Sequence, residues 1–407
     1  MGYVVQLYRN AYKGISPASW WLSLVMLINR AGTMVVPFMT LYLTQKRHYS
    51  ISHSGAVVAC FGLGAISGGF LGGKLTDKFG FYYVQVAALL CGGVMFIVLG
   101  QLENFPLLCC FTYVLAVLNE SFRPANSTAI AQYSTTENRS RCFSLNRLAI
   151  NLGWSVGSAI GGFVALHNYE LLFWIDGISN IAAALLLTLV LAPSKNAATP
   201  AFSKKVEKKT DVGSPYRDKV YLVFIANVTL FSYAFYQLFS TVPVYFKIKL
   251  NLTSDVIGSI MSMNGLIIAL IEMALVYHLE TKRKNMMFMF AGALCMAAAF
   301  VSLNVLPGTA SKAIFAILVV TAAEMIAIPF MNTFMVSRTN DENRGQYSGL
   351  YTIGWSIAQV IGPSTGTLIA DHLGFDVLWW VVGVLCVFCG LGIQLLQKMV
   401  ANEQKFA

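Results

Sequence analysis

Arg30, Glu120, Arg123, Glu272 and Glu324 are ionisable residues inside long apolar stretches of the sequence. A charge in the core of a bilayer costs at least about 2.5 to 3.5 kcal/mol, so such a residue normally faces a cavity or a partner. A guanidinium can hold an anion, and a carboxyl can carry a proton. These residues therefore predict a solute-binding or proton-carrying site within a membrane.

Arg30, Glu120 and Arg123 form the first candidate group. Arg30 lies about twelve residues into its apolar stretch, roughly 18 Å along a helix at 1.5 Å per residue, which places it near the membrane midplane. Glu120 and Arg123 are three residues apart, so they share a helix face and can pair. Two interpretations stay open: a substrate pocket that Arg30 joins, or a salt bridge that only stabilises the first half of the chain.

Glu272 and Glu324 form the second group, because no basic residue lies three or four positions from either one. A carboxyl that loses water without gaining a cation can take up a proton near neutral pH, which is what a proton carrier needs. Asn264, two turns before Glu272, favours Glu272 by marking a polar path. Glu120 is a third candidate for proton coupling, although Arg123 favours its ionised form. The alternative is that each acid stays neutral and hydrogen-bonded between helices.

Uncharged polar and aromatic residues at helical spacing complete a predicted pocket lining. Packing alone is the competing interpretation for each of them. Together with Arg30, Glu120 and Arg123, the predicted substrate-binding residues are Asn29, Tyr233, Tyr236, Gln237, Asn264, Trp355 and Gln359.

Long apolar helices must position these residues, since 57% of the chain is hydrophobic and only 11% is charged. Soluble domains carry about 25% charged residues. A membrane-spanning helix needs roughly 20 mostly apolar residues. Twelve stretches qualify: 19–43, 54–72, 82–102, 106–128, 145–166, 171–191, 220–243, 256–278, 286–305, 313–335, 349–370 and 375–396.

A polar, lysine-rich segment at 195–219 divides the chain into two predicted six-helix bundles, 1–194 and 220–407. An ungapped match at an offset of 205 residues relates them. It pairs Pro124 with Pro329 and Arg139 with Arg344. The predicted fold is therefore an all-α membrane protein with twelve transmembrane helices in two pseudo-symmetric bundles, which suits a central site that opens alternately to either side.

The distribution of basic residues predicts that both termini and the linker are cytoplasmic. With that orientation 21 of the 28 Lys and Arg residues lie in cytoplasmic segments. The net charge of +10 is thereby explained without a nucleic-acid partner. Residues 1–17 lack the features of a removable signal peptide. The eight cysteines lie mostly in apolar runs without His or acidic companions, so neither a metal site nor a disulfide framework is expected.

One segment carries a resemblance to a known family. Gly73, Asp77, Lys78 and Gly80, within Gly-Lys-Leu-Thr-Asp-Lys-Phe-Gly, resemble the signature loop of the major facilitator superfamily after the second helix. Gly73 would let helices approach closely, and Asp77 could cap or pair with a neighbouring helix end. The resemblance implies a gating loop; a plain turn is the alternative. It also implies that helices one, four, seven and ten surround the cavity.

Two further segments resemble branches of that superfamily. Gly157 to Gly162 is similar to a Gly-rich element of its antiporters, and the passage from Asn119 to Trp154 looks like bacterial drug and metabolite efflux members. Asn29-Arg30 is more faintly similar to a pair in proton-coupled peptide transporters.

These features predict a proton-coupled secondary transporter in the cytoplasmic (inner) membrane, embedded in lipid, functional as a monomer and without a cofactor. Export of a small amphipathic organic solute by antiport is favoured. The alternative is a proton-coupled importer, or symporter, of peptides or other small metabolites. An enzyme is not expected because no His-rich motif occurs. A channel is disfavoured because duplicated halves with buried acids suit alternating access.

Overall fold

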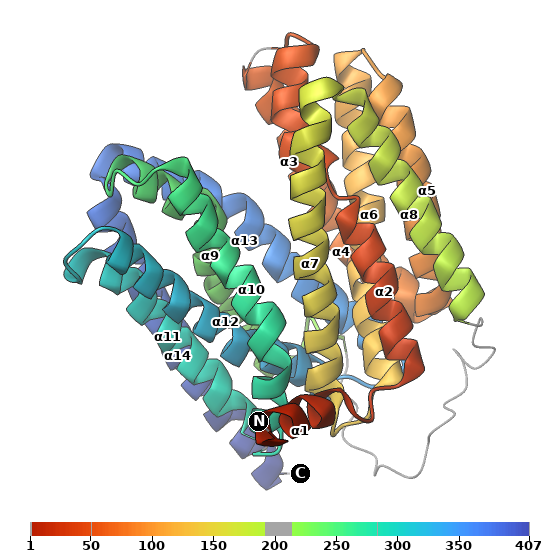
Figure 1. The fold of residues 1–407 in the computed structure, drawn as a ribbon. Coiled ribbons are helices and arrows are strands. Elements are labelled where there is room, and N and C mark those ends of the chain that lie inside the picture. The colour runs from red at the N-terminus through yellow and green to blue at the C-terminus, as the bar shows by residue number, and fades with distance from the viewer. Residues whose placement is uncertain (1, 50, 192–213, 283, 407) are drawn as a thin grey trace. The chain divides into compact units, whose positions relative to one another are not determined.

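The computed structural model describes residues 2–49, 51–191, 214–282 and 284–406, and over these ranges every regular element is a helix (Figure 1). Most of the predicted linker, 195–213, lies outside the described residues. The elements of the first half are α1 Gly2–Tyr12, α2 Pro17–Ala31, α3 Val35–Leu41, the π-helix η1 Tyr42–Lys46, α4 Ile51–Phe79, α5 Phe81–Gln101, α6 Phe105–Tyr133, α7 Arg139–His167 and α8 Glu170–Val190. Those of the second half are α9 Lys219–Ile248, α10 Ser254–Glu280, α11 Asn285–Val305, α12 Ala310–Ser337, α13 Arg344–Leu373 and α14 Phe375–Phe406.

Nine of the described helices are long and apolar enough to cross a membrane by length and composition alone: α4, α5, α6, α8, α9, α10, α11, α12 and α14. The remaining three predicted spans correspond to the first helix, α7 and α13. The first helix is divided into α2, α3 and η1, and α2 has only 15 residues. α7 begins with three arginines within its first nine residues, and α13 is rich in Gly, Ser and Thr.

One expectation about the first residues was wrong, and one element was not expected. The segment before residue 17 contains a helix, α1, which packs against α10, where the Tyr8 hydroxyl donates to the carbonyl of Leu270. The first membrane helix, expected to be continuous over 19–43, is interrupted at residues 32–34. Ser16 caps α2 by accepting a hydrogen bond from the Ser19 amide at 3.2 Å, and Pro17 follows at a position where its missing N–H has no cost.

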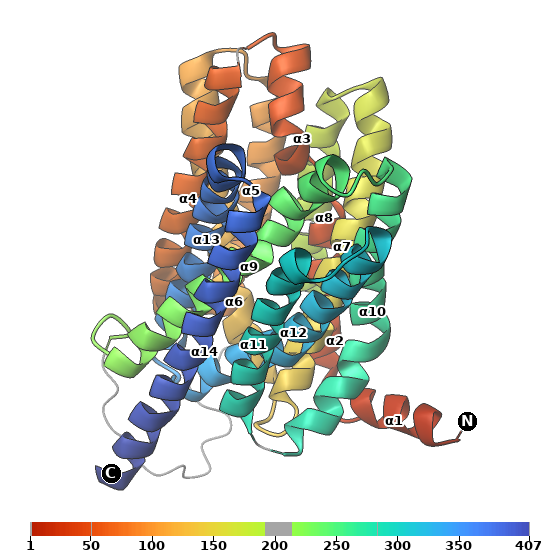
Figure 2. The same ribbon diagram turned by 90° about the vertical axis from the view of Figure 1, so that its left-hand side faces the viewer.

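The contacts between helices divide the chain into two compact units. The N-terminal unit comprises Gly14–Lys209 and Thr339–Ile353, and the C-terminal unit comprises Met1–Lys13, Thr210–Arg338 and Gly354–Ala407. Each end of α13 therefore belongs to a different unit. In the C-terminal unit α11 packs along both α12 and α14 (Figure 2). The predicted domain boundaries at 194 and 220 stay a prediction.

The two halves repeat the same local structure at corresponding positions. α6 and α12, α7 and α13, and α8 and α14 begin 205 residues apart, at Phe105 and Ala310, Arg139 and Arg344, and Glu170 and Phe375. The turn before α7 is closed by a bond from the Thr135 amide to Asn138 Oδ1 at 2.8 Å, and the turn before α13 by its counterpart from Asn340 to Asn343 at 2.9 Å. Equivalent residues thus make equivalent bonds in both halves.

Small residues bring α4 and α6 into close contact in the N-terminal unit (Figure 1). A Cβ at Gly68 would lie 2.6 Å from the Val117 carbonyl oxygen, and one at Gly72 would lie 2.5 Å from Ser121 Cα. Close helix packing in membranes relies on such small residues. The register holds Glu120 against α4, because the same Cβ at Gly68 would be 3.1 Å from Glu120 Cβ.

Candidate functional site

The interruption in the first membrane helix is organised by an acid on α8. Both carboxylate oxygens of Asp176 accept from the Met34 amide, at 2.9 and 3.0 Å, and one accepts from the Val35 amide at 2.8 Å. The first amides of a helix lack intrahelical partners, and a negative charge there is favourable. Asp176 is fully buried, so it has left water for these backbone donors.

Two further contacts fasten the interruption to α8. Asn29 Nδ2 donates to Asn180 Oδ1 at 2.8 Å, and Asn180 Nδ2 donates to the Asp176 carbonyl at 2.7 Å. Gly32 lies so close to Ser179 that a Cβ at position 32 would overlap the hydroxyl. Asn29, predicted to bind substrate, here serves a helix contact.

Asp176 is not among the residues predicted from the sequence. It is an acid within the predicted span 171–191, so the rule that selected the other five ionisable residues applies to it as well. Its position near one end of the span conceals it, because a charge near a helix end can reach the headgroups. Only its contacts with α3 reveal a buried role.

Arg30 lies in the last turn of α2, beside the interruption. A Cβ at Gly153 of α7 would be 2.5 Å from Arg30 Cβ, and one at Gly157 would be 2.9 Å from the Ala31 carbonyl oxygen. The two glycines therefore let the α7 backbone reach the end of α2. A positive charge in the last turn is favoured by the helix dipole.

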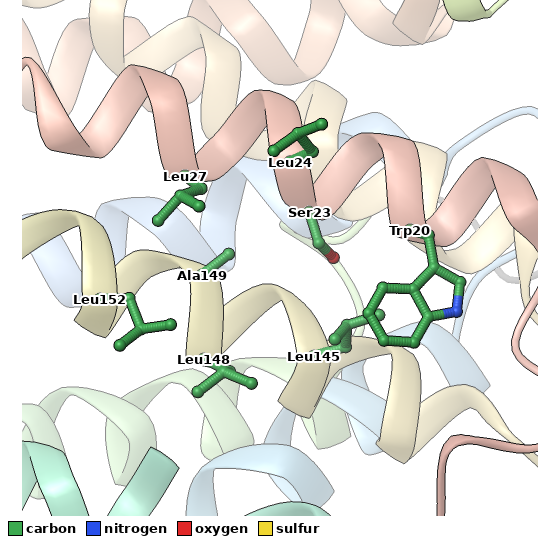
Figure 3. A pocket seen from close by; sticks show the side chains of 8 residues that line it. All are labelled: Trp20, Ser23, Leu24, Leu27, Leu145, Leu148, Ala149 and Leu152. Carbon is green, nitrogen blue, oxygen red and sulfur yellow. The ribbon is translucent and has the colours of Figure 1, made fainter.

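Before they converge at Arg30, α2 and α7 leave a groove of about 160 Å³ between them. Figure 3 shows Trp20, Leu24 and Leu27 from α2 on one side and leucines from α7 on the other. The remaining lining residues are Ser23, Leu145, Leu148, Ala149 and Leu152. Ser23 donates its hydroxyl to the Ser19 carbonyl at 2.9 Å, so the groove can receive an apolar group but offers little for a polar one.

Glu120 and Arg123 form an ion pair on α6, with Arg123 Nε 3.0 Å from Glu120 Oε2. The Glu120 side chain is 9% exposed and that of Arg123 is 27% exposed. The i, i+3 spacing that suggested the pair thus corresponds to a contact.

In the C-terminal unit, Glu324 on α12 accepts a hydrogen bond from Asn264 Nδ2 on α10 at 3.1 Å, and the same amide donates to Thr321 Oγ1 at 2.9 Å. Glu324 is 1% exposed and Glu272 on α10 is 2% exposed. Asn264, which favoured Glu272 in the sequence argument, is bonded to Glu324.

A cluster between α9 and α13 gathers five of the predicted lining residues within the C-terminal unit. Tyr236 donates to Gln359 Oε1 at 3.4 Å, and the Trp355 ring stacks edge-on against Tyr236, with centroids 6.1 Å apart. Tyr233 shares a 2.9 Å hydrogen bond with Thr365. Gln237 is fully buried and donates to the Gly362 carbonyl at 2.8 Å, which makes it a helix contact.

The predicted gating loop is mostly helical, so the expectation of a loop over residues 73–80 was wrong. α4 continues through Phe79, and only Gly80, with φ of +83°, makes the turn into α5. Asp77 therefore lies on the surface of α4, where it contacts another helix. Its carboxylate accepts from the Gly345 amide at 2.5 Å and from the Gln346 amide at 2.9 Å, in the first turn of α13.

The other residues of this segment support the Asp77 contact. A Cβ at Gly73 would lie 2.7 Å from the Gly345 carbonyl oxygen, so the glycine permits the approach of α13. Lys78 lies over the Phe79 ring, 5.1 Å from its centroid. Asp77 thus joins two helices of the N-terminal unit through backbone amides at a helix N-terminus.

Each of these groups lies within one unit: the Asp176, Arg30, Glu120 and Asp77 contacts in the N-terminal unit, and the Glu324 and Tyr236 contacts in the C-terminal unit. Among the described residues, no group of three or more His, Cys, Asp or Glu side chains is arranged to hold a metal ion. The arrangement provides buried acids, an arginine and aromatic rings rather than a metal centre.

The sequence is similar to those of several known transporters. An uncharacterised MFS-type transporter, YqjV of Bacillus subtilis, is 21% identical over 95% of this chain and 94% of its own length. A Na⁺, Li⁺, K⁺/H⁺ antiporter of Planococcus maritimus is 24% identical, covering 89% and 91%. Multidrug resistance protein 2 of Bacillus subtilis is 23% identical, covering 91% and 92%.

A solved structure shares the fold. The human organic anion transporter MFSD10 superposes with a TM-score of 0.71 over 93% of this chain and all of that chain, at 14% identity. The predicted all-α fold of twelve membrane helices in two bundles is confirmed, and the protein is a transporter rather than an enzyme. The family model described as Major Facilitator Superfamily matches residues 22–363 and 326–404. The chain therefore belongs to the Major Facilitator Superfamily, as an integral membrane transporter of small molecules.

Proposed function

We propose that the protein is a proton-coupled transporter that exports small amphipathic organic solutes across the cytoplasmic membrane by alternating access. The observation that carries this proposal is the Glu324 carboxyl, 1% exposed and 3.1 Å from Asn264 Nδ2 between α10 and α12. A carboxyl oxygen can accept from an amide in either protonation state. Proton binding can therefore change the charge of this site while the hydrogen bond persists.

Glu324 is the first proposed proton carrier and Glu272 the second. Glu120 is less suited, because it is already paired with the Arg123 cation at 3.0 Å. Glu324 and Glu272 lie on adjoining helices, so a proton at one can alter the field at the other. The site between α10 and α12 would favour one conformation of the C-terminal unit when it is charged and another when it is neutral.

The cluster of Tyr233, Tyr236, Trp355 and Gln359 is the proposed contact for the polar and aromatic part of the solute. Its rings offer apolar area and its hydroxyl and amide groups offer hydrogen bonds, which is how small-molecule sites combine affinity and specificity. The apolar groove that ends near Arg30 is a second surface for an apolar group. Relatives named for multidrug resistance and for cation/proton antiport support export and proton coupling.

The test is transport in proteoliposomes with an imposed pH gradient, comparing the parent with Glu324→Gln, Glu272→Gln and Glu120→Gln. Glutamine mimics the protonated acid, so a carrier variant should lose the response to the gradient yet keep substrate exchange. Retention of the full response in Glu324→Gln and Glu272→Gln, with loss in Glu120→Gln, would place coupling at the ion pair.

Vesicles of both orientations test direction. Accumulation of the solute in inside-out vesicles, in exchange for protons, supports export. Uptake with protons in right-side-out vesicles would instead support the importer of peptides or other metabolites.

A further inference from the structure

The Asp176 carboxylate occupies the place of two backbone carbonyls. In a continuous helix the Met34 amide would donate to the Arg30 carbonyl, and the Val35 amide to that of Ala31. Both amides instead donate to Asp176 at 2.8 to 3.0 Å, and the Met34 amide also makes a 3.1 Å bond to the Gly32 carbonyl. The Arg30 carbonyl accepts from the Thr33 amide at 3.1 Å, in a tighter turn. The interruption of the first helix is therefore a competition between one carboxylate and two carbonyls.

We propose that Asp176 is a second proton-binding group of the transport cycle, and that its ionisation decides whether the first membrane helix is broken or continuous. This inference rests on the proposed proton coupling and extends it to the N-terminal unit. The step is the addition of one proton from water to one carboxylate oxygen, which gives a neutral carboxylic acid and breaks no other covalent bond.

The ionised acid favours the broken helix. A carboxylate accepts through both oxygens, and bonds to a charged acceptor are about twice as strong as those between neutral groups. Inside a protein this advantage grows because the local dielectric is low. The two amides therefore leave the carbonyls of the preceding turn for Asp176.

The neutral acid favours the continuous helix. Protonation converts one acceptor oxygen into an O–H donor, which cannot accept as the carboxylate did from both amides. An amide without a partner in a membrane is costly, so the Val35 amide needs a new acceptor, and the Met34 amide keeps only its 3.1 Å bond to the Gly32 carbonyl. The Arg30 and Ala31 carbonyls lie one turn back and are the nearest ones that restore helical geometry.

The consequence for transport is a movement of Arg30. Arg30 is in the last turn of α2, directly before the interruption, and Gly153 of α7 lies against its Cβ. Straightening the chain at residues 32–34 rotates this turn relative to α7. Broken membrane helices mark binding sites in transporters because their ends bear partial charges. Here the ionisation of Asp176 would set the position of the one cation on α2.

Asp176 is the acid that lies at the interruption, and the helices packed around it carry few other charged residues. α3 and α5 carry no Asp, Glu, Lys, Arg or His, and Arg30 is the only such residue of α2. On α5 the titratable side chains are Tyr82, Tyr83 and Cys91. The remaining charged or titratable residues on α7 and α8 are Arg139, Arg141, Cys142, Arg147, His167 and Glu170, and Tyr169 directly precedes α8.

The experiment measures the conformation of the first helix against pH in the full-length protein in lipid nanodiscs. Spin labels at Trp21→Cys and His48→Cys, in a background without native cysteines, report the distance across the interruption. The variants are Asp176→Asn and, as the matched control, Glu170→Gln, which removes an acid from the exposed first turn of the same helix. Infrared difference spectra after a pH jump report the protonated carboxyl directly.

The parent and Glu170→Gln should show two distance populations whose ratio changes by up to about tenfold per pH unit, as one linked proton requires. Asp176→Asn should show the low-pH distance at every pH and lose one infrared carboxyl band. A distance in the parent that does not change with pH, or a pH response retained in Asp176→Asn, would overturn the inference.

Two further variants keep the outcome separate from folding and from the proposed coupling site. Asp176→Glu retains a titrating acid, so it should keep a pH-dependent distance with a shifted midpoint; a distance independent of pH would count against the inference. Glu324→Gln should keep the full distance response. If Glu324→Gln and Glu272→Gln also keep pH-driven transport, neither glutamate is the proton carrier, and the inference about Asp176 is unaffected.

Discussion

The contact of Asp77 with the first turn of α13 leads to a sharp prediction: Asp77→Asn should slow transport far more than it lowers stability. The carboxylate accepts from the amides of Gly345 and Gln346 at 2.5 and 2.9 Å. Asparagine keeps one acceptor oxygen and loses the charge. The variant should therefore weaken the attachment of α13 without leaving a cavity.

The size of the effect follows from these two bonds. A charge near a helix N-terminus contributes about 0.3 to 1 kcal/mol, and up to about 2 kcal/mol when it is partly buried. Loss of a capping side chain costs a similar amount. We expect a loss of about 1 to 2 kcal/mol in the conformation that holds the contact, which is a factor of about 5 to 30 in its population. The initial transport rate should change by up to that factor.

The assay compares the initial rate of substrate transport in proteoliposomes with the yield of monodisperse protein and its melting temperature. The melting temperature should fall by only a few degrees, because about 1 to 2 kcal/mol is small compared with the enthalpy of unfolding. Glu342→Gln is the matched control, since it neutralises an exposed acid two residues before α13 begins. Equal loss of rate and yield in Asp77→Asn would refute the argument and return Asp77 to a purely structural role.

Four further predictions follow from particular contacts. Gly72→Leu should destabilise the protein by at least about 1 to 3 kcal/mol, because a Cβ at position 72 would lie 2.5 Å from Ser121 Cα. Gly258→Ala should leave the melting temperature nearly unchanged, because a Cβ at position 258 would have no atom within 4 Å. Arg338→Ala should lower the melting temperature, because Arg338 pairs with both Asp218 at 2.8 Å and Glu403 at 2.5 Å, and the variant removes this cation from the half-buried Asp218. Thermal unfolding measures the change, with Arg217→Ala as the control. Trp355→Ala should weaken substrate binding by about tenfold while Trp380→Ala, on an exposed face of α14, should not, as measured by ligand-induced stabilisation. An experimental structure should superpose the halves with Pro124 on Pro329 and Arg139 on Arg344; unrelated positions for these pairs would refute the duplication.

The sequence alone determined the class of the protein. Apolar stretches long enough to cross a bilayer can pair their backbone groups only as helices, so composition and length predict the membrane helices without knowledge of their neighbours. The repeat at 205 residues is also local information, and it corresponds to the common starts of α6 and α12 and of α7 and α13. The pairing of Glu120 with Arg123 was predictable because both lie on one helix.

Tertiary structure decided which acid meets which partner. Asp176 bonds a residue 142 positions away, Asn264 one 60 positions away and Asp77 one 268 positions away. Helical periodicity carries information over three or four residues, so it cannot identify these partners. The break after Arg30 was hidden for the same reason, since residues 32–34 contain no proline and the acid that accepts from the Met34 and Val35 amides belongs to another helix. The carboxylate that accepts from the amides at the break belongs to α8, and only the folded chain brings it to the backbone.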